Sequence, residues 1–275
     1  MRKGSSEKSH HPGAGASNPA GPDALSDAAS APTRTIQLLN VRIDNLTMDE
    51  LLARFDRGTL CTVHSDMLMW LQKDRALYEI ATRCAYVTCD SQILAFATRL
   101  LGTPVKERIS GSDFLPRFYA YHRNHRDISL FLLGGLGDVA DRASQIINRK
   151  VGRNIVVGSL SPPIGAETSE AACRDMVNRV NASKASVLVL GLGTPKQERF
   201  LERYRALMPS VRIFLPLGGA LDYEAGAMKR PPAWVSNIGL EWAYRFIQEP
   251  RKRWKRYLVD DVPVIHLILK QKAGL

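Results

Sequence analysis

Asp90 is the residue whose position most directly suggests chemistry. It follows the short apolar run 86–89 and precedes a helical pattern. A carboxylate at such a place can cap the helix, or it can act as a general base that takes a proton from a substrate hydroxyl. The spacing alone favours the cap. Thr62 and His64 stand at the end of another apolar run, where they could bind a substrate or form an ordinary turn.

Two glycine-containing strand ends raise the question of a phosphate site. The segment 191–196 supplies two glycines of a dinucleotide-binding fingerprint, but Lys196 occupies the position of the third, and the segment 134–137 does not fit either. An NAD-dependent oxidoreductase is therefore disfavoured. A helix that begins near Pro195 would direct its N–H groups at an anion. Ordinary glycines in strand-to-helix turns are the alternative at both segments.

A basic, aromatic cluster lies near the C-terminus, and the formal net charge of +11 agrees with an acidic partner. At an anionic membrane each basic residue adds on the order of 1 kcal/mol, and arginines also grip diphosphates. Single-stranded nucleic acid is a rival partner, because it takes the same mixture of basic and stacking side chains. A solvated basic face is the plain alternative. The cluster consists of Arg245, Arg251, Lys252, Arg253, Lys255 and Arg256, with Trp242, Trp254 and Tyr257 among them.

Composition narrows the class of protein further. The four cysteines lack the spacing of metal ligands, which favours unpaired thiols in a reducing compartment. No segment approaches the roughly 18 uncharged apolar residues of a membrane-spanning helix, so we expect a soluble or peripheral protein. Residues 1–33 are rich in Ser, Ala, Gly and Pro and lack the apolar stretch of a signal peptide. They are predicted to form a disordered tail.

The elements that must position these residues alternate between strand and helix. Apolar runs predict strands at 35–41, 60–63, 86–89, 128–133, 155–157, 186–190 and 211–217. Helical patterns occupy 65–71, 93–101 and 139–151, and Thr47 with Glu50 is typical of a capped helix start. This order predicts an α/β fold with a mostly parallel sheet and helices on both faces. The candidate groups then gather where the strands end. We expect a catalytic domain at 34–228 and a basic helical appendage at 229–275.

Several separate segments, in order, resemble the WecG/TagA/CpsF glycosyltransferases over roughly residues 36–269. The resemblance is carried by segments at both ends of the predicted domain and in the appendage: 62–64, 89–91, 107–113, 190–198, 218–226, 229–232, 239–245, 249–251 and 256–257.

The resemblance implies a Rossmann-like α/β domain whose C-terminal appendage closes the site at the membrane. It implies an inverting transfer from a UDP-sugar to a sugar linked to a polyprenyl diphosphate, without a cofactor or a required metal. Family members build teichoic acid linkage units, enterobacterial common antigen and capsular polysaccharides or exopolysaccharides. Their donors include UDP-N-acetylmannosamine, its uronic acid and UDP-glucose. The chain is expected to be cytoplasmic and peripheral at the inner face of the plasma membrane, with no nucleic-acid partner, and a homo-oligomer is left open.

The resemblance also assigns roles to particular residues. Asp90 matches the proposed general base, and Thr62 matches a threonine required beside it. Arg108, Gln197 and Asp222 match polar residues of the substrate site, while the appendage arginines match groups that meet the diphosphate, namely Arg245, Arg251 and Arg256. The family usually has asparagine in place of His64, glycine in place of Ser91 and phenylalanine in place of Leu221. The first two differences lie beside the expected reacting centre, so they bear on the identity of the sugar.

Overall fold

The computed structural model describes residues 34–229 and 261–273. The chain begins with a hairpin of β1 (Thr35–Leu38) and β2 (Val41–Asp44), followed by α2 (Met48–Arg54). A parallel sheet then takes up β3 (Gly58–Val63), β4 (Tyr86–Cys89), β5 (Leu130–Gly134), β6 (Val156–Leu160), β7 (Val187–Gly191) and β8 (Ile213–Pro216). The strand order is β4-β3-β8-β7-β5-β6, and every pairing in this sheet is parallel.

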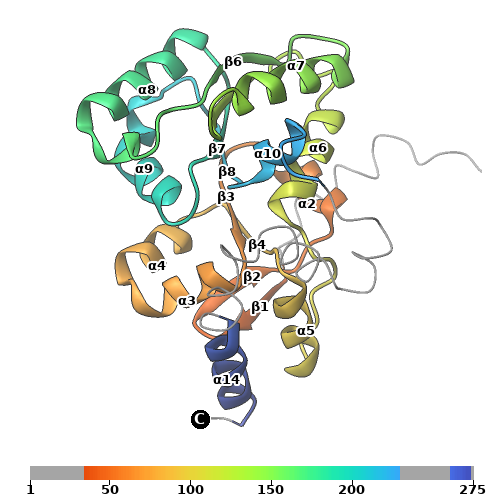
Figure 1. Cartoon of the computed structure of the whole chain (residues 1–275). Helices are drawn as coiled ribbons and strands as arrows, with labels where there is room; N and C mark the ends of the chain where they lie inside the picture. The colour runs from red at the N-terminus through yellow and green to blue at the C-terminus, as the bar shows by residue number, and fades with distance from the viewer. Residues whose placement is uncertain (1–33, 230–260, 274–275) are drawn as a thin grey trace, which may run out of the picture. The chain divides into compact units, whose positions relative to one another are not determined.

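Helices connect these strands and cover both faces of the sheet (Figure 1). They are α3 (Ser65–Lys73), α4 (Arg75–Thr82), α5 (Gln92–Leu100), α6 (Gly111–Tyr121), α7 (Val139–Val151), α8 (Glu170–Ser183), α9 (Lys196–Tyr204), α10 (Ala220–Glu224) and, near the C-terminus, α14 (Asp261–Lys272). Single 3₁₀ turns occupy Ala166–Thr168 and Arg205–Leu207. Both the α/β fold and the parallel sheet predicted from the sequence are confirmed.

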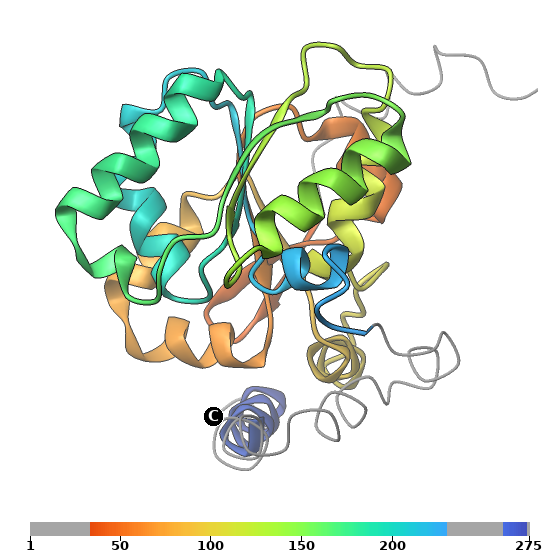
Figure 2. The ribbon, with the colours of Figure 1, turned by 45° about the horizontal axis from the view of Figure 1, so that its top comes forward.

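The central strands are buried on both faces, which explains their nearly continuous apolar sequences. In β5, Leu130 and Leu132 pack with α6 and α7, whereas Phe131 and Leu133 pack with α8 and α9. Figure 2 shows the two groups of helices on opposite sides of the strands. At about 25 cal/mol per Å², these faces supply most of the free energy that stabilises the fold.

The predicted elements differ from the structure in two respects. Residues 35–41 do not form one strand: Leu39 takes a left-handed conformation (φ +53°), and the chain turns back into an antiparallel hairpin. Four helices were not predicted, namely α4, α6, α8 and the short α10. The first three each begin at a side chain that accepts a hydrogen bond from the helix's first turn: Asp74, Ser110 and Ser169. The predicted capping box of Thr47 and Glu50 is confirmed.

The last helix, α14, packs against the hairpin region. Its Val264 and Ile268 are buried in the apolar cluster that includes residues of β1, α3 and α5. The backbone N–H of Leu39 donates to Oε1 of Gln271 at 2.9 Å. The remainder of the predicted appendage up to Asp260 and the predicted tail 1–33 lie outside the described residues. Among the helices of the described part, none is long and apolar enough to cross a bilayer.

Candidate active site

A cleft of about 140 Å³ opens across the carboxyl ends of four neighbouring strands, β4, β3, β8 and β7. Each of these strands is followed by a loop that contributes polar groups. In an open parallel sheet this edge is where ligands bind, because side chains from separate parts of the chain meet there. The cleft is lined by Thr62, His64, Asp90, Ser112, Thr194, Gln197, Glu198, Pro216, Leu217, Gly218, Gly219, Ala220 and Tyr223.

Hydrogen bonds of both its backbone and its side chain hold Asp90 at this edge. Its N–H donates to the carbonyl of Val63 at 2.9 Å, and its Oδ2 accepts from the N–H of Gly111 at 3.0 Å. Its own carbonyl accepts from Nη1 of Arg108 at 3.0 Å. The expectation that Asp90 caps the next helix is wrong: Ser91 is the N-cap of α5, and its Oγ accepts from the N–H of Leu94 at 3.1 Å.

Arg108 lies behind Asp90 and is not among the described residues that line the cleft. Besides the carbonyl of Asp90, its guanidinium contacts Oδ2 of Asp113 at 3.1 Å. The neighbouring N–H of Ile109 donates to the carbonyl of Cys89 at 2.9 Å, so the loop covers the edge strand β4. This loop fixes the backbone on which the Asp90 carboxylate is mounted.

Thr62 and His64 come from the end of β3, the strand beside β4. Thr62 is in register with Thr88, two residues before Asp90. His64 is the N-cap of α3, and its Nδ1 accepts from the N–H of Met67 at 3.3 Å. Because this cap uses a lone pair on Nδ1, the proton of the neutral ring is on Nε2. The ring thus faces the cleft with its tautomer fixed by a helix start.

Gln197 and Glu198 form the first turn of α9, and both are buried. As predicted, the helix begins beside Pro195. The amide of Gln197 donates to Oε1 of Glu198 at 3.0 Å, and its oxygen accepts from the N–H of Gly218 at 3.3 Å. Gln197 therefore joins the end of β8 to the start of α9. Burial raises the pKa of the Glu198 carboxyl.

Asp222 lies on α10, whose Ala220 and Tyr223 face the cleft, but Asp222 itself does not line it. The short helix is anchored from behind by Glu224, whose carboxylate is almost completely buried. Its Oε2 accepts from Nζ of Lys150 at 2.7 Å and from the hydroxyl of Tyr119 at 3.0 Å. These contacts tie α10 to α7 and α6. Arg245, Arg251 and Arg256, predicted to meet a diphosphate, lie outside the described residues.

The family model for the WecG/TagA/CpsF glycosyltransferases matches residues 36–275. The chain belongs to this family. It is a glycosyltransferase. It is also 28% identical over 218 residues to the N-acetylglucosaminyldiphosphoundecaprenol N-acetyl-beta-D-mannosaminyltransferase of Bacillus subtilis (strain 168), a match that covers 79% of this chain and 81% of that protein. The expected family membership is confirmed.

The glycines at the strand ends of this glycosyltransferase have a packing role. A Cβ on Gly134 would lie 2.5 Å from the backbone of Gly191, and one on Gly191 would lie 3.0 Å from the carbonyl oxygen of Gly218. The ends of β5, β7 and β8 thus approach too closely for side chains. This favours ordinary strand-end glycines over a phosphate site at these two positions, because each glycine allows a close backbone contact between neighbouring strands.

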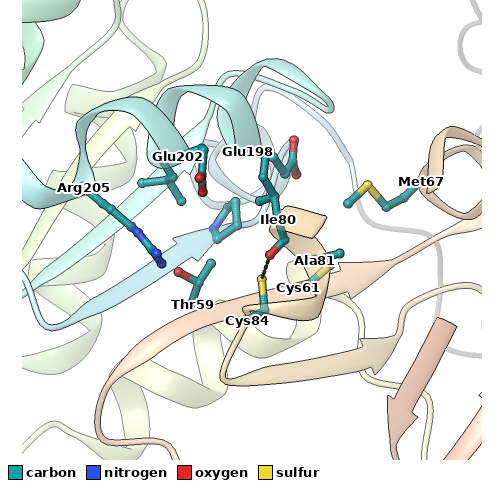
Figure 3. Close-up of a pocket in the computed structure, with 11 residues that line it drawn as sticks. Thr59, Cys61, Met67, Ile80, Ala81, Cys84, Glu198, Glu202 and Arg205 are labelled. Carbon is teal, nitrogen blue, oxygen red and sulfur yellow. Dashed lines mark hydrogen bonds between the residues drawn. The ribbon is translucent and has the colours of Figure 1, made fainter. Parts of the chain in front are cut away.

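Behind the cleft of the glycosyltransferase lies a small, mainly apolar cavity (Figure 3). Glu198 and Glu202 approach it from α9, while Cys61 and Cys84 lie on the opposite side. None of the four cysteines is in a disulfide. Burial raises the pKa of the Cys89 thiol to about 12, with a smaller effect from the charge of Asp90, so this thiol stays protonated. Within the described residues, no group of three or more His, Cys, Asp or Glu side chains could hold a metal ion.

Sequence reasoning missed Glu198 as a site residue. A glutamate in the first turn of a helix is commonly a solvated partner of the helix dipole. A signal was nevertheless present: Glu198 and Leu201 are three positions apart and therefore share a face of α9, and Leu201 is buried. The cleft also includes Ser112, Thr194 and Tyr223, which no sequence motif had singled out as site residues.

Proposed function

We propose that the protein transfers a sugar from a UDP-sugar to a sugar linked to a polyprenyl diphosphate, with inversion at the anomeric carbon. The observation that carries the proposal is the meeting of Asp90, Thr62 and His64 in one cleft of a chain that belongs to the WecG/TagA/CpsF family. The name of the Bacillus subtilis relative specifies an acceptor of the same chemistry, N-acetylglucosaminyldiphosphoundecaprenol. The product would enter a bacterial surface polysaccharide.

In the proposed reaction, an acceptor hydroxyl attacks the anomeric carbon of the donor while the bond from that carbon to the UDP oxygen breaks. The hydroxyl proton passes to the carboxylate of Asp90, whose Oδ2 is oriented by the N–H of Gly111. Thr62 lies on the neighbouring strand and would hold a substrate hydroxyl. Arg108 would contribute by fixing the backbone of Asp90, since its guanidinium donates to the Asp90 carbonyl.

The leaving UDP gains negative charge as the bond breaks, and preorganised positive groups lower that barrier. Arg245, Arg251 and Arg256 are the proposed diphosphate ligands. His64 would donate from Nε2 to the donor sugar. Gln197 would shape the wall of the cleft through Gly218, while Asp222, one residue before the cleft-lining Tyr223, would contact the substrate from α10.

We place the enzyme at the inner face of the plasma membrane, bound peripherally through its basic C-terminal segment. The acceptor has a lipid anchor and the donor is water-soluble, so the site must reach both phases. The alternating aromatic and basic residues of 242–257 suit a headgroup region.

The test is a transfer assay with a panel of UDP-sugars and a short-chain polyprenyl diphosphate that carries N-acetylglucosamine. We expect the enzyme to transfer the sugar of one donor in the panel with inversion. The leading donors are UDP-N-acetylmannosamine, its uronic acid and UDP-glucose. The expected product is a disaccharide on the lipid, which mass spectrometry detects. Absence of transfer from every donor, with the protein folded and bound to vesicles that contain the acceptor, would contradict the proposal.

A further inference from the structure

Glu198 is a buried acid at the boundary of two cavities. Its side chain lines both the cleft and the small cavity behind it, and only 8% of the residue is exposed. Oε1 accepts two hydrogen bonds, from the Thr194 hydroxyl at 3.3 Å and from the Gln197 amide at 3.0 Å. Oε2 is buried and has no hydrogen-bond partner within the described residues.

The surroundings disfavour a charge on this carboxyl. Within the described part of the chain, Glu198 forms no ion pair, although many surface carboxylates do. A buried carboxylate without a neighbouring cation loses its hydration, and no ion pair compensates that loss of free energy. Burial accordingly raises the pKa of Glu198, and the hydrogen bonds from Gln197 and Thr194 only partly oppose this effect.

The titratable groups around Glu198 are few, and none of those in the described part of the chain forms an ion pair with it. Cys61 faces it across the small cavity, and the pKa of that thiol is raised by contact with Cys84 and by burial. Glu202 and Arg205 line the same cavity from the following turns of the chain (Figure 3). On the cleft side, the other titratable groups are His64, Asp90 and Tyr223. Arg205 is the one cation among these described groups.

We propose that Glu198 is a positioning residue that works as a neutral carboxylic acid: it orients the Gln197 amide so that Gln197 holds Gly218, and thereby fixes the cleft wall opposite Asp90. The geometry allows one orientation of this amide. Its nitrogen must face Oε1 of Glu198, and its oxygen must then face the N–H of Gly218. Without Glu198 the amide could rotate and release the loop 218–220. This inference rests on the proposed function only for its kinetic test.

The kinetic test compares Glu198→Gln, Glu198→Ala and wild type between pH 5.5 and 9.5, with a UDP-sugar and the short-chain acceptor. The side-chain oxygen of glutamine can still accept from the Thr194 hydroxyl and the Gln197 amide, and its N–H replaces the O–H of the acid. We therefore expect kcat/KM at neutral pH to stay within about fivefold of wild type, a change no larger than the loss of one ordinary hydrogen bond. Alanine should lower kcat about 100-fold, as expected for a displaced reacting geometry. The wild-type rate should fall as the pH rises through the folded pKa of Glu198, and Glu198→Gln should lack that fall.

The matched control is Glu202→Gln, because Glu202 lies one turn further along α9 and is exposed, paired with Arg83. It should keep the pH-dependent fall of the wild-type rate. Two results would overturn the proposal: Glu198→Ala with a rate near wild type, or a folded Glu198→Gln that is as impaired as Glu198→Ala at every pH.

A second measurement does not depend on catalysis. A carboxyl whose pKa is raised by folding contributes its full stability below its unfolded pKa of about 4.3 and loses that contribution as the pH rises through the folded value. We therefore expect the melting temperature of wild type to fall relative to Glu198→Gln between pH 5 and pH 9. A difference in melting temperature that stays constant over this pH range would contradict the proposal that Glu198 is a neutral acid. If no sugar is transferred from any donor, the proposed function fails, but this melting experiment still decides whether Glu198 is protonated in the folded protein.

Discussion

Asp90 is the proposed base, and its surroundings orient its carboxylate while the loop that contains Arg108 supports its backbone. Oδ2 faces the N–H of Gly111, and the Asp90 carbonyl is held by Arg108. A base must lie within hydrogen-bond reach of the proton that it takes, so these contacts matter as much as the chemical type of the side chain.

Replacing Asp90 with asparagine tests this role. Asparagine can still accept from Gly111 through Oδ1, so the fold should be kept, but its other atom becomes an N–H donor that cannot take a proton. We expect kcat to fall by about 100-fold to 10,000-fold with an unchanged melting temperature. Asp113→Asn, which changes the partner of Arg108 and not the base, is the control and should lose much less. Near-normal turnover by folded Asp90→Asn would exclude Asp90 as the base.

His64 caps α3 and also lines the cleft, where we propose that it contacts the donor sugar. Since its Nδ1 caps α3, asparagine at this position would keep the cap through its side-chain oxygen and remove the ring edge from the cleft. We expect His64→Asn to melt like wild type but to change the ratio of kcat/KM between two UDP-sugars by about tenfold or more. His64→Leu should lose about 1 kcal/mol of stability with the cap. An unchanged donor ratio in His64→Asn would remove His64 from donor selection.

From the sequence, the position of a candidate residue in the fold could be predicted better than its hydrogen-bond partners. Thr62, His64 and Asp90 could be placed together because they lie at or just after the ends of strands, which meet at one edge of a parallel sheet. The capping expectation for Asp90 failed because Ser91, the next residue, competes for the same helix start. The only local signal for Glu198 is the face of α9 that it shares with Leu201, because its burial depends on the β3 and α4 residues that pack across the small cavity.

At the scale of elements, strands were easier to predict than helices. The buried strands are continuous apolar runs, whereas α4 has only Leu77 and Ala81 as buried residues and leaves a faint pattern. In α8, Cys173, Met176, Val177 and Val180 do follow the helical period, so that helix was predictable from spacing. The order of strands in the sheet, which brings β8 beside β3 and β7 beside β8, depends on long-range packing and has no local signal.

The end of α6 contains a pH-sensitive contact. Nδ1 of His122 lies 2.9 Å from Nδ1 of His125, so one ring must donate and the other accept, and Arg153 binds the backbone carbonyls of both residues. Burial, followed by the charge of His125, lowers the pKa of His122 to about 4. A histidine with a lowered folded pKa stabilises the protein above its unfolded value of 6.5, and that contribution is lost as the pH falls toward 4.

Replacing His122 with phenylalanine should remove this acid sensitivity. We expect the free energy of unfolding, from urea titrations between pH 6.5 and 4, to fall less steeply than in wild type, by up to about 1.4 kcal/mol per pH unit. His266→Gln is the control, because His266 is exposed on α14, and it should keep the wild-type slope. If His122→Phe has the wild-type slope as well, acid lability arises elsewhere.

For the whole molecule, the buried part of α14 determines how membrane binding can be tested. Val264 and Ile268 belong to the same apolar cluster as residues of β1 and α3, and Gln271 binds the hairpin turn. Truncation before the basic segment would remove these residues from the core and confuse unfolding with loss of binding. Substitutions that change charge and keep α14 are therefore the better test.

Replacing Lys252, Arg253 and Lys255 with glutamine tests membrane attachment without touching the arginines proposed to bind diphosphate. At roughly 1 kcal/mol per basic residue, the three changes should weaken binding to anionic vesicles by about 100-fold. Transfer to an acceptor embedded in vesicles should fall with binding, whereas transfer to a short-chain soluble acceptor should stay near wild type. The control removes the same charge from exposed Arg75, Arg174 and Arg179, whose ion pairs along single helices contribute little. Both triple variants have the same net charge. If only the variant of Lys252, Arg253 and Lys255 loses vesicle binding, the C-terminal segment is the site of attachment. If both variants lose binding equally, the overall charge of the protein explains the attachment.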